Sequence, residues 1–194
     1  MKIMGFNGSP RKNSNTQALI EAVFKGAEDK GAQTHLVNLN EGNIRGCQGC
    51  DGCKKNPGRC VQKDDLSPLL EELTACDALV LGTPVYYYHA SAQFKAFADR
   101  LYCFLGYDSE SPDGTKIAFP AGKKMVTVTS RGDVKEALNR PELYDYFEEW
   151  LKMVTGFLGP ASVEFVHHYE SGTIKARDNA ELMARAASVG ASLV

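Results

Sequence analysis

Four cysteines within fifteen residues are the part of this sequence best suited to chemistry. They stand in the stretch GCQGCDGCKKNPGRC with the spacing C-x2-C-x2-C-x6-C, as Cys47, Cys50, Cys53 and Cys60. Thiolates bind soft metals and take part in redox chemistry, and thiols can also pair as disulfides. Four interpretations are open at this point: a disulfide clasp, a zinc site, an iron–sulfur ligand set, or a cysteine-rich loop that binds nothing.

Composition narrows the class of protein. The chain has 194 residues, of which 43% are hydrophobic, so we expect one domain over residues 1–194 with a substantial core. A net charge of -2 and a pI near 6.1 favour neither nucleic acid nor an anionic membrane as partner. No apolar run approaches the roughly 20 residues of a membrane span. The start MKIMGFNGSP does not resemble a signal peptide. We therefore expect a cytoplasmic protein with reduced thiols, which argues against the disulfide clasp.

Apolar segments alternate between strand-like and helix-like patterns along the chain. Such an alternation predicts an α/β fold in which a doubly wound parallel sheet of five strands is covered by helices on both faces. The expected strands are 2–7, 34–39, 77–84, 124–130 and 161–168, and the expected helices are 16–30, 66–75, 91–105, 141–159 and 179–194. Two long connections remain, the cysteine-rich loop at about 40–65 and the loop 106–123.

The connection after the first strand suggests an anion site. Its sequence NGSPRKNSNT is rich in hydroxyl and amide side chains and runs directly into a helix N-terminus. Free N–H groups and a partial positive charge at that terminus favour a bound anion. Neither a Walker pattern nor a G-x-G-x-x-G turn is present, so a monophosphate is expected rather than a triphosphate or a dinucleotide. The alternative is an ordinary helix cap in a polar surface turn.

The connections after the third and fourth strands suggest a site for a flat ring. The third strand is followed by TPVYYYHASAQ, whose tyrosines offer an aromatic wall, and the fourth by TSRGD, whose glycine lets backbone approach a ligand. Ligands of open parallel sheets bind at the carboxyl ends of the strands. A monophosphate at the first loop and a planar heteroaromatic ring at the other two have the shape of flavin mononucleotide (FMN).

These motifs, with the cysteine segment, resemble the flavodoxin-like NAD(P)H-dependent FMN reductases, and most closely their iron–sulfur flavoprotein branch. The similarity extends in order from Met1 to about Arg131. It implies the strand order 2-1-3-4-5, FMN as cofactor, and a homodimer or homotetramer. By position, it implies phosphate contacts from Ser9, Arg11, Ser14, Asn15 and Thr16, and ring contacts from Pro84, Val85, Tyr86, Tyr87, Ser130, Gly132 and Asp133.

The cysteine spacing favours a 4Fe-4S cluster. Three thiols, each two residues from the next, resemble the bacterial ferredoxin pattern, whereas structural zinc sites usually pair two C-x2-C units across a longer stretch. Lys54, Lys55 and Arg59 could offset the negative charge of a cluster. A zinc site and an empty or disulfide-forming thiol loop remain as alternatives. Cys76 and Cys103 stand alone in apolar surroundings and are expected to be buried, inert thiols.

The function expected from these features is electron transfer through FMN. The donor would be NAD(P)H or a reduced ferredoxin-like carrier, and the acceptor a small molecule such as a quinone or a flavin. Hydride transfer to a flavin needs no protein acid or base, and no catalytic residue is predicted. One alternative is an electron carrier that acts between protein partners without a small substrate of its own. Another, less consistent with the flavin motifs, is a metal-stabilised binding module.

Overall fold

A central parallel sheet organises the computed structural model, which describes residues 1–112, 114–134 and 141–194. Its five long strands lie in the order β2-β1-β3-β7-β8, and all neighbouring pairs among them are parallel. In chain order this is 2-1-3-4-5, so the predicted topology is confirmed. The bounds are β1 (Lys2–Asn7), β2 (Gln33–Asn38), β3 (Ala78–Tyr86), β7 (Lys124–Ser130) and β8 (Ser162–His168).

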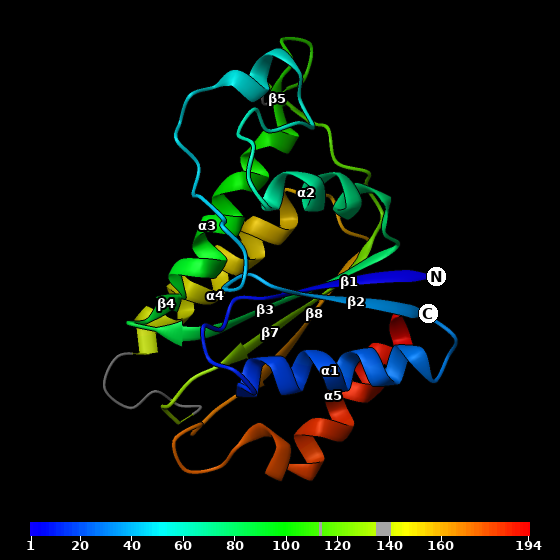
Figure 1. Cartoon of the computed structure of the whole chain (residues 1–194), viewed down its shortest axis with the longest axis vertical. Helices are drawn as coiled ribbons and strands as arrows, with labels where there is room; N and C mark the ends of the chain where they lie inside the picture. The colour runs from blue at the N-terminus through cyan, green and yellow to red at the C-terminus, as the bar shows by residue number, and fades with distance from the viewer. Residues whose placement is uncertain (113, 135–140) are drawn as a thin grey trace.

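Helices cover both faces of the sheet and complete the predicted three layers (Figure 1). One face carries α1 and α5, and the other carries α2, α3 and α4. A separate cluster of buried apolar side chains fills each of the two interfaces between sheet and helices. The helices span α1 (Asn15–Glu28), α2 (Leu66–Ala75), α3 (Ala92–Arg100), α4 (Pro141–Gly156) and α5 (Ala180–Leu193).

Local sequence explains why these elements begin where they do. The hydroxyl of Ser14 accepts a hydrogen bond from the backbone of Gln17, and Ser91 caps α3 in the same way, so both helices begin at a serine cap. Strand β3 is buried over its first seven residues, as expected for a strand with helices on both faces. At the crossing of α1 and α5, a Cβ on Gly26 would stand 1.8 Å from the Ala187 carbonyl oxygen, so only glycine allows this close packing.

Two predicted segments differ from the structure in kind, while most other predicted bounds differ by one to three residues. The helix expected over 91–105 ends at Arg100 and continues as a 3-10 turn, η2 (Leu101–Phe104). The connection 106–123, expected to be a plain loop, contributes to an antiparallel hairpin of β5 (Leu105–Tyr107) and β6 (Thr115–Ile117). Strands of three residues are too short for an alternating pattern to reveal them.

The cysteine-rich segment leaves the carboxyl end of β2 and crosses to another part of the molecule. In Figure 1 it rises past α3 to a short 3-10 helix, η1 (Gly52–Lys55), beside β5. The backbone N–H of Gly58 donates to the Cys103 carbonyl (2.7 Å), and the Lys54 ammonium donates to the carbonyls of Tyr102 (2.8 Å) and Leu105 (2.5 Å). The segment is therefore attached to η2 and the hairpin.

No helix within the described ranges combines the length and apolar character needed to cross a membrane.

Candidate functional site

A cavity of about 520 Å³ opens at the carboxyl ends of β1, β3 and β7. In a parallel sheet of this order, successive strands are added on one side of the first strand and then, from the third strand on, on its other side. Ligands bind at this switch point, between the first and third strands. Ten of the twelve residues predicted to contact a cofactor line this cavity: Ser9, Arg11, Ser14, Asn15, Thr16, Pro84, Val85, Tyr86, Ser130 and Gly132. Three connections far apart in the sequence therefore meet at one site, as the sequence predicted.

The loop between β1 and α1 is shaped by its own side chains. The amide oxygen of Asn7 accepts a hydrogen bond from the Ser9 backbone (3.0 Å), and the Ser9 hydroxyl accepts one from the Arg11 backbone (3.3 Å). Asn13 adopts a left-handed conformation with φ of 51°, which asparagine tolerates better than most residues. These turns wrap the loop around the first turn of α1, where unpaired backbone N–H groups are available to an anion.

Thr16 is the most informative residue of this loop. It is only 1% exposed, and its hydroxyl has no hydrogen-bond partner within the described part of the chain. Buried hydroxyls are nearly always paired, since an unpaired one loses its bonds to water without replacement. Thr16 lines the cavity at the start of α1, so its hydroxyl is placed to bond a ligand there.

Two glycines allow β1, β3 and the helices to approach closely at the back of the cavity. A Cβ on Gly82 would lie 2.6 Å from the Ile20 Cδ1 atom and 2.9 Å from the Thr16 Cγ2 atom. A Cβ on Gly8 would lie 2.6 Å from the Phe94 Cβ atom. Thr16 can therefore take its position in the cavity because Gly82 has no Cβ atom.

The three consecutive tyrosines after β3 do not act as one wall. Tyr86 lines the cavity and pairs with His89 of β4 (His89–Ala90) across a tight hairpin. Tyr87 and Tyr88 form the turn with φ of 48° and 63°, and Tyr87 is 98% exposed at its tip. Tyr88 turns to the ring of Tyr144, with centroids 5.4 Å apart. Tyr87 does not line the cavity because the hairpin turn directs it to solvent.

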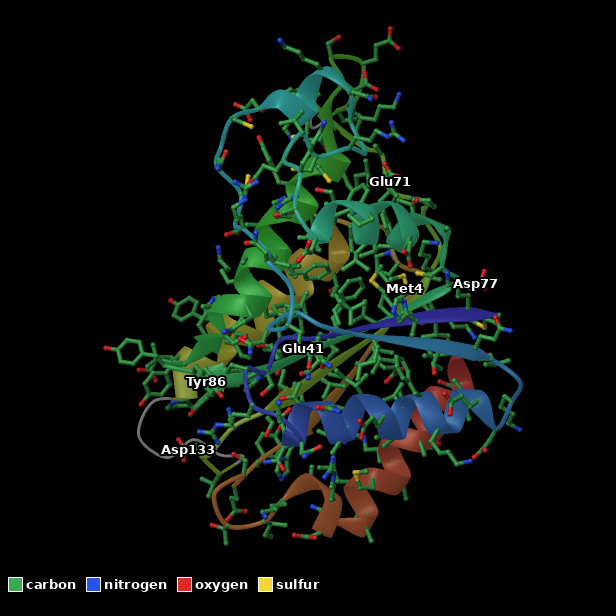
Figure 2. All side chains as sticks on the ribbon, viewed as in Figure 1. Met4, Glu41, Glu71, Asp77, Tyr86 and Asp133 are labelled. Atoms are coloured by element: carbon green, nitrogen blue, oxygen red, sulfur yellow. The ribbon has the colours of Figure 1, made fainter. Side chains whose placement is uncertain are left out.

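Asp133 also stands outside the cavity, although Ser130 and Gly132 line it. Its carboxylate accepts hydrogen bonds from the Val134 backbone (2.9 Å) and the Tyr144 hydroxyl (3.3 Å), so it stabilises the loop after β7. Figure 2 shows Tyr86 and Asp133 at the same end of the sheet. Ser130 Oγ is 3.0 Å from His168 Nδ1 on the neighbouring strand.

Five further residues line the cavity without having been predicted. Lys12 and Asn13 belong to the first loop, and Ser171, Lys175 and Arg177 come from the connection between β8 and α5. That connection, which includes the short 3-10 helix η3 (Ala176–Asp178), passes beneath the first loop. The amide oxygen of Asn15 accepts a hydrogen bond from the Ala176 backbone (3.0 Å) and so joins the two segments.

The lining residues give the cavity a positive charge. Four of them are cationic, and none of the described lining residues carries a carboxylate. Arg177 lies 3.8 Å from Glu21, which does not line the cavity. Basic groups, hydroxyls and a helix N-terminus together suit a phosphate monoester. The four cations are Arg11, Lys12, Lys175 and Arg177.

The four cysteines of the segment line a second, much smaller cavity of about 10 Å³. Cys47 and Cys50 are exposed, Cys60 is partly exposed and Cys53 is buried. No group of three or more histidine, cysteine or acidic side chains in the described chain has the closeness of a metal site. This cavity and the larger one share no lining residue.

Two observations nevertheless fit the cysteine segment to a thiolate-bound centre. All four cysteines line one cavity that Arg100 also lines, and the buried Nε atom of Arg100 has no partner in the described chain. A Cβ on Gly46 or Gly49 would meet no atom within 4 Å, so the backbone beside Cys47 and Cys50 borders open space. The donor type and the shared cavity therefore fit a metal or cluster.

The remaining two cysteines, Cys76 and Cys103, are buried as predicted, but Cys103 does not stand alone, because it lines the small cavity with the four cysteines of the segment. Burial raises the pKa of the Cys103 thiol to about 12 and also raises the pKa of the Cys76 thiol. Both are held in the neutral form at physiological pH, in which thiols are poor nucleophiles and poor ligands.

Comparison with known proteins places the chain in a family. The model of the family described as NADPH-dependent FMN reductase matches residues 1–155. An iron-sulfur flavoprotein of Archaeoglobus fulgidus is 39% identical over 101 residues, covering 52% of this chain and 46% of that protein. An FMN-dependent NADH:quinone oxidoreductase of Methylocella silvestris is 36% identical over 111 residues, covering 57% and 54%. The chain thus aligns with about half the length of these relatives.

Solved structures show the same fold. An NAD(P)H:quinone oxidoreductase from Methanothermobacter marburgensis superposes with a TM-score of 0.79 at 17% identity, covering 100% of this chain and 99% of that one. An FMN-dependent NADH-azoreductase from Bacillus anthracis, solved in complex with FMN, gives a TM-score of 0.71 at 14% identity, with coverage of 100% and 98%. With a family match over residues 1–155, the chain belongs to the NADPH-dependent FMN reductases.

Proposed function

We propose that the chain is an FMN-dependent oxidoreductase that moves electrons from NAD(P)H to a small acceptor such as a quinone or a flavin. The observation that carries the proposal is the cavity at the sheet's carboxyl edge, which four cationic side chains line together with Thr16, whose buried hydroxyl has no partner among the described residues. Family membership and the names of the relatives support the same activity.

The residues of the cavity divide into two groups by chemistry. Ser9, Arg11, Ser14, Asn15 and Thr16 would hold the FMN phosphate, and Lys175 and Arg177 would add charge from the opposite side. Pro84, Val85 and Tyr86 would face the flat ring, with Ser130 and Gly132 at its edge. Together these groups would fix the cofactor's orientation and keep water from one side of it.

Bound FMN supplies the chemistry, because a flavin can take up the two electrons and the proton of a hydride and release the electrons singly or as a pair. The protein therefore needs no acid or base of its own for the hydride step. A quinone acceptor takes two electrons, and its two protons come from solvent and from the reduced cofactor. The protein's part is to bind FMN and leave one face open to the donor and the acceptor.

The cysteine segment is proposed to hold an iron–sulfur cluster as a second redox centre. Support comes from the single cavity that Cys47, Cys50, Cys53 and Cys60 share and from the spacing of the first three. A cluster would pass single electrons, so it would allow exchange with a one-electron carrier such as a ferredoxin-like protein.

We further propose that residues 1–194 form one FMN-binding domain and that it works in the cytoplasm as a homodimer or homotetramer. The core clusters on the two faces of one continuous sheet support a single domain. The exposed ring of Tyr87 beside the cavity mouth supports self-association, because a neighbouring subunit would bury it. Sedimentation equilibrium would show a single-chain mass if self-association is wrong.

Steady-state kinetics test the proposed activity. The FMN-loaded protein should oxidise NADH or NADPH in the presence of a soluble quinone, and Thr16→Val should lower the rate at limiting FMN because less cofactor is bound. The matched control Thr127→Val alters a buried threonine of β7 that does not line the cavity and should leave the rate unchanged. Absence of turnover with both donors by a protein that demonstrably holds FMN would refute the reductase proposal.

A further inference from the structure

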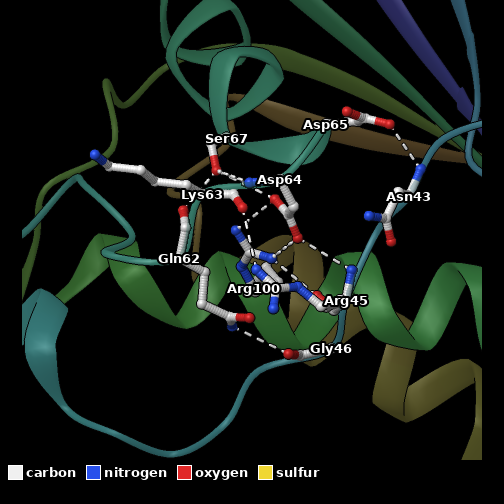
Figure 3. A network of polar contacts seen from close by, with 9 residues as sticks. All are labelled: Asn43, Arg45, Gly46, Gln62, Lys63, Asp64, Asp65, Ser67 and Arg100. Carbon is white, nitrogen blue, oxygen red and sulfur yellow. Dashed lines mark hydrogen bonds and ion pairs between the residues drawn. The ribbon is translucent and has the colours of Figure 1, made fainter.

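A network of polar contacts closes the cysteine segment at its base (Figure 3). The backbone N–H of Arg45 donates to the Asp64 carboxylate (3.0 Å), and the Arg45 guanidinium donates to the Lys63 carbonyl (3.1 Å). The amide of Gln62 donates to the Gly46 carbonyl (3.1 Å). Residues before the first cysteine are thus bonded to residues just after the fourth, and all four thiols lie on the loop between them.

Arg100, the last residue of α3, stands at the centre of this network. Its guanidinium donates two hydrogen bonds to the Asp64 carboxylate, at 2.6 and 3.1 Å, and a third to the Arg45 carbonyl at 2.8 Å. The two side chains of the ion pair are 0% and 1% exposed. One arginine therefore holds both ends of the cysteine loop, in a bidentate geometry that lysine cannot reproduce.

The three hydrogen bonds of this network come from the terminal nitrogens of the guanidinium and do not use its Nε atom. The Nε atom is buried without a partner in the described part of the chain, and Arg100 lines the small cavity with all four cysteines. A buried ion pair is weak support for stability, because apolar residues of similar volume often serve as well. An unpaired charged donor costs further free energy, so its place beside the thiols calls for another explanation.

Two of the other cations near the cysteines, Lys54 and Arg59, are already engaged. The Lys54 ammonium bonds two backbone carbonyls and lies 3.2 Å from the centre of the Tyr102 ring. Arg59 is 3.2 Å from the carboxylate of Glu71 on α2. Among the described residues that line the thiol cavity, Arg100 is the one with a cationic side chain. The sequence pointed to Lys54, Lys55 and Arg59, and it could not reveal Arg100, which is 40 residues further along the chain than Cys60.

We propose that Arg100 is a positioning residue for the cysteine-bound cluster, with two roles. Its guanidinium closes the loop through Asp64 and Arg45, and its Nε–H donates to sulfur in the cavity. This inference rests on the proposed iron–sulfur cluster and deepens it. Hydrogen bonds to sulfur stabilise the reduced, more negative form of a cluster and so raise its reduction potential. A zinc site, which has no redox change, would gain no such effect.

A pair of variants separates the two roles. Arg100→Lys keeps the positive charge and can still bond Asp64, but it removes the Nε–H donor. Asp64→Asn keeps the arginine and removes the negative charge beside it. After anaerobic reconstitution with iron and sulfide, we expect the cluster's midpoint potential, measured by EPR-monitored titration, to move to more negative values in Arg100→Lys and to more positive values in Asp64→Asn.

Opposite shifts are the readout that a purely structural role would not produce. If Arg100 only holds the loop, both variants should lose iron in similar proportion, and the clusters that remain should keep the wild-type potential. If Arg100→Lys does not fold, the double variant Arg100→Met/Asp64→Leu removes the buried pair together and should also show a more negative potential, because both charges leave and the donor is lost.

Three results would overturn the proposal: an unchanged potential in folded, iron-loaded Arg100→Lys, shifts of the same sign in both single variants, or no iron uptake by the wild-type chain. FMN binding, measured by quenching of flavin fluorescence in the same samples, keeps the two proposals apart. A wild-type chain that binds FMN but no iron would refute the role of Arg100 and leave the flavin site standing.

Discussion

Replacing Thr16 by valine should change FMN binding and apoprotein stability in opposite directions. Valine has the shape of threonine with a methyl group in place of the hydroxyl. In the structure this hydroxyl is buried at the first turn of α1 and has no partner within the described residues. The variant therefore removes a group that costs free energy in the free protein and that FMN would satisfy.

The size of both effects follows from the state of that hydroxyl. A buried polar atom without a partner costs about 1–3 kcal/mol, so Thr16→Val should raise the free energy of unfolding of the apoprotein by roughly that amount. The lost bond to phosphate should weaken FMN binding by about 1–3 kcal/mol, which is roughly 5-fold to 150-fold in Kd. Urea unfolding without FMN and fluorescence titration with FMN measure the two quantities separately.

Thr127→Val is the matched control. Its hydroxyl is also buried without a partner in the described chain, but it lies on β7 and does not line the cavity. It should gain stability in the same way and bind FMN like the wild type. Equal FMN affinity in Thr16→Val and the wild type would refute the phosphate role of Thr16. A large loss of apoprotein stability in Thr16→Val would refute the claim that this hydroxyl is unpaired in the apoprotein.

Three other predictions concern the fold and its ionisation. Burial raises the pKa of Asp64, but hydrogen bonds from Arg100 and from the Arg45 backbone outweigh this and lower it from 3.8 to about 2. Because the pKa of Asp64 is lower in the folded state than in the unfolded state, the ionised carboxylate contributes about 2 kcal/mol of stability above pH about 4, and this is lost as the pH falls towards 2. The difference in unfolding free energy between wild type and Asp64→Asn, measured in urea, should therefore shrink over this range. A constant difference would contradict the lowered pKa of Asp64. Gly26→Ala should destabilise the fold by about 3 kcal/mol in thermal unfolding, since the new Cβ would stand 1.8 Å from the Ala187 carbonyl oxygen. The control Gly172→Ala, whose Cβ would have no atom within 4 Å, should stay within about 0.5 kcal/mol of wild type. Tyr87→Asn should stabilise the chain by roughly 1 kcal/mol in urea unfolding, because Tyr87 is 98% exposed and has φ of 48°. A loss of stability would contradict the expected relief of backbone strain.

The sheet could be predicted from sequence because each strand carries its own pattern. The expected strands 2–7 and 124–130 have the observed bounds, as does the expected helix 66–75. A strand buried on both faces is a continuous apolar run, and a helix against a sheet shows a period near four, so both signals are local. Among the described residues, the short strands were missed, namely β4 and the hairpin of β5 and β6, since their stability comes from pairing between short segments.

The part of the cavity formed by the loop between β1 and α1 could also be predicted, because its residues are neighbours in the sequence. Ser9 to Thr16 form one continuous turn before α1, and strand order alone brings Pro84 and Ser130 to it. Lys175 and Arg177 were missed because they follow the fifth strand, three places from the first in the sheet. Only the tertiary path of that connection, held by the Asn15 amide, returns them to the site.

Side-chain direction was the part least accessible from sequence. Tyr86 and Tyr87 are adjacent, yet one lines the cavity and the other is turned to solvent by a hairpin with two left-handed residues. Asp133 is likewise engaged by Tyr144, a contact between a loop and a distant helix. Arg100 reaches the cysteines only because α3 ends beneath their loop, and a helix pattern carries no information about such an encounter.

A comparison of FMN with riboflavin tests the central claim most directly. The two ligands share the ring and differ in the phosphate, which the hydroxyls and cations of the cavity are proposed to hold. Isothermal titration of the purified apoprotein should show one FMN per chain and a Kd for riboflavin at least about tenfold higher, as expected for the loss of charge-assisted hydrogen bonds. Equal affinities for the two ligands, or no binding of FMN, would contradict the proposed phosphate site and with it the proposed function.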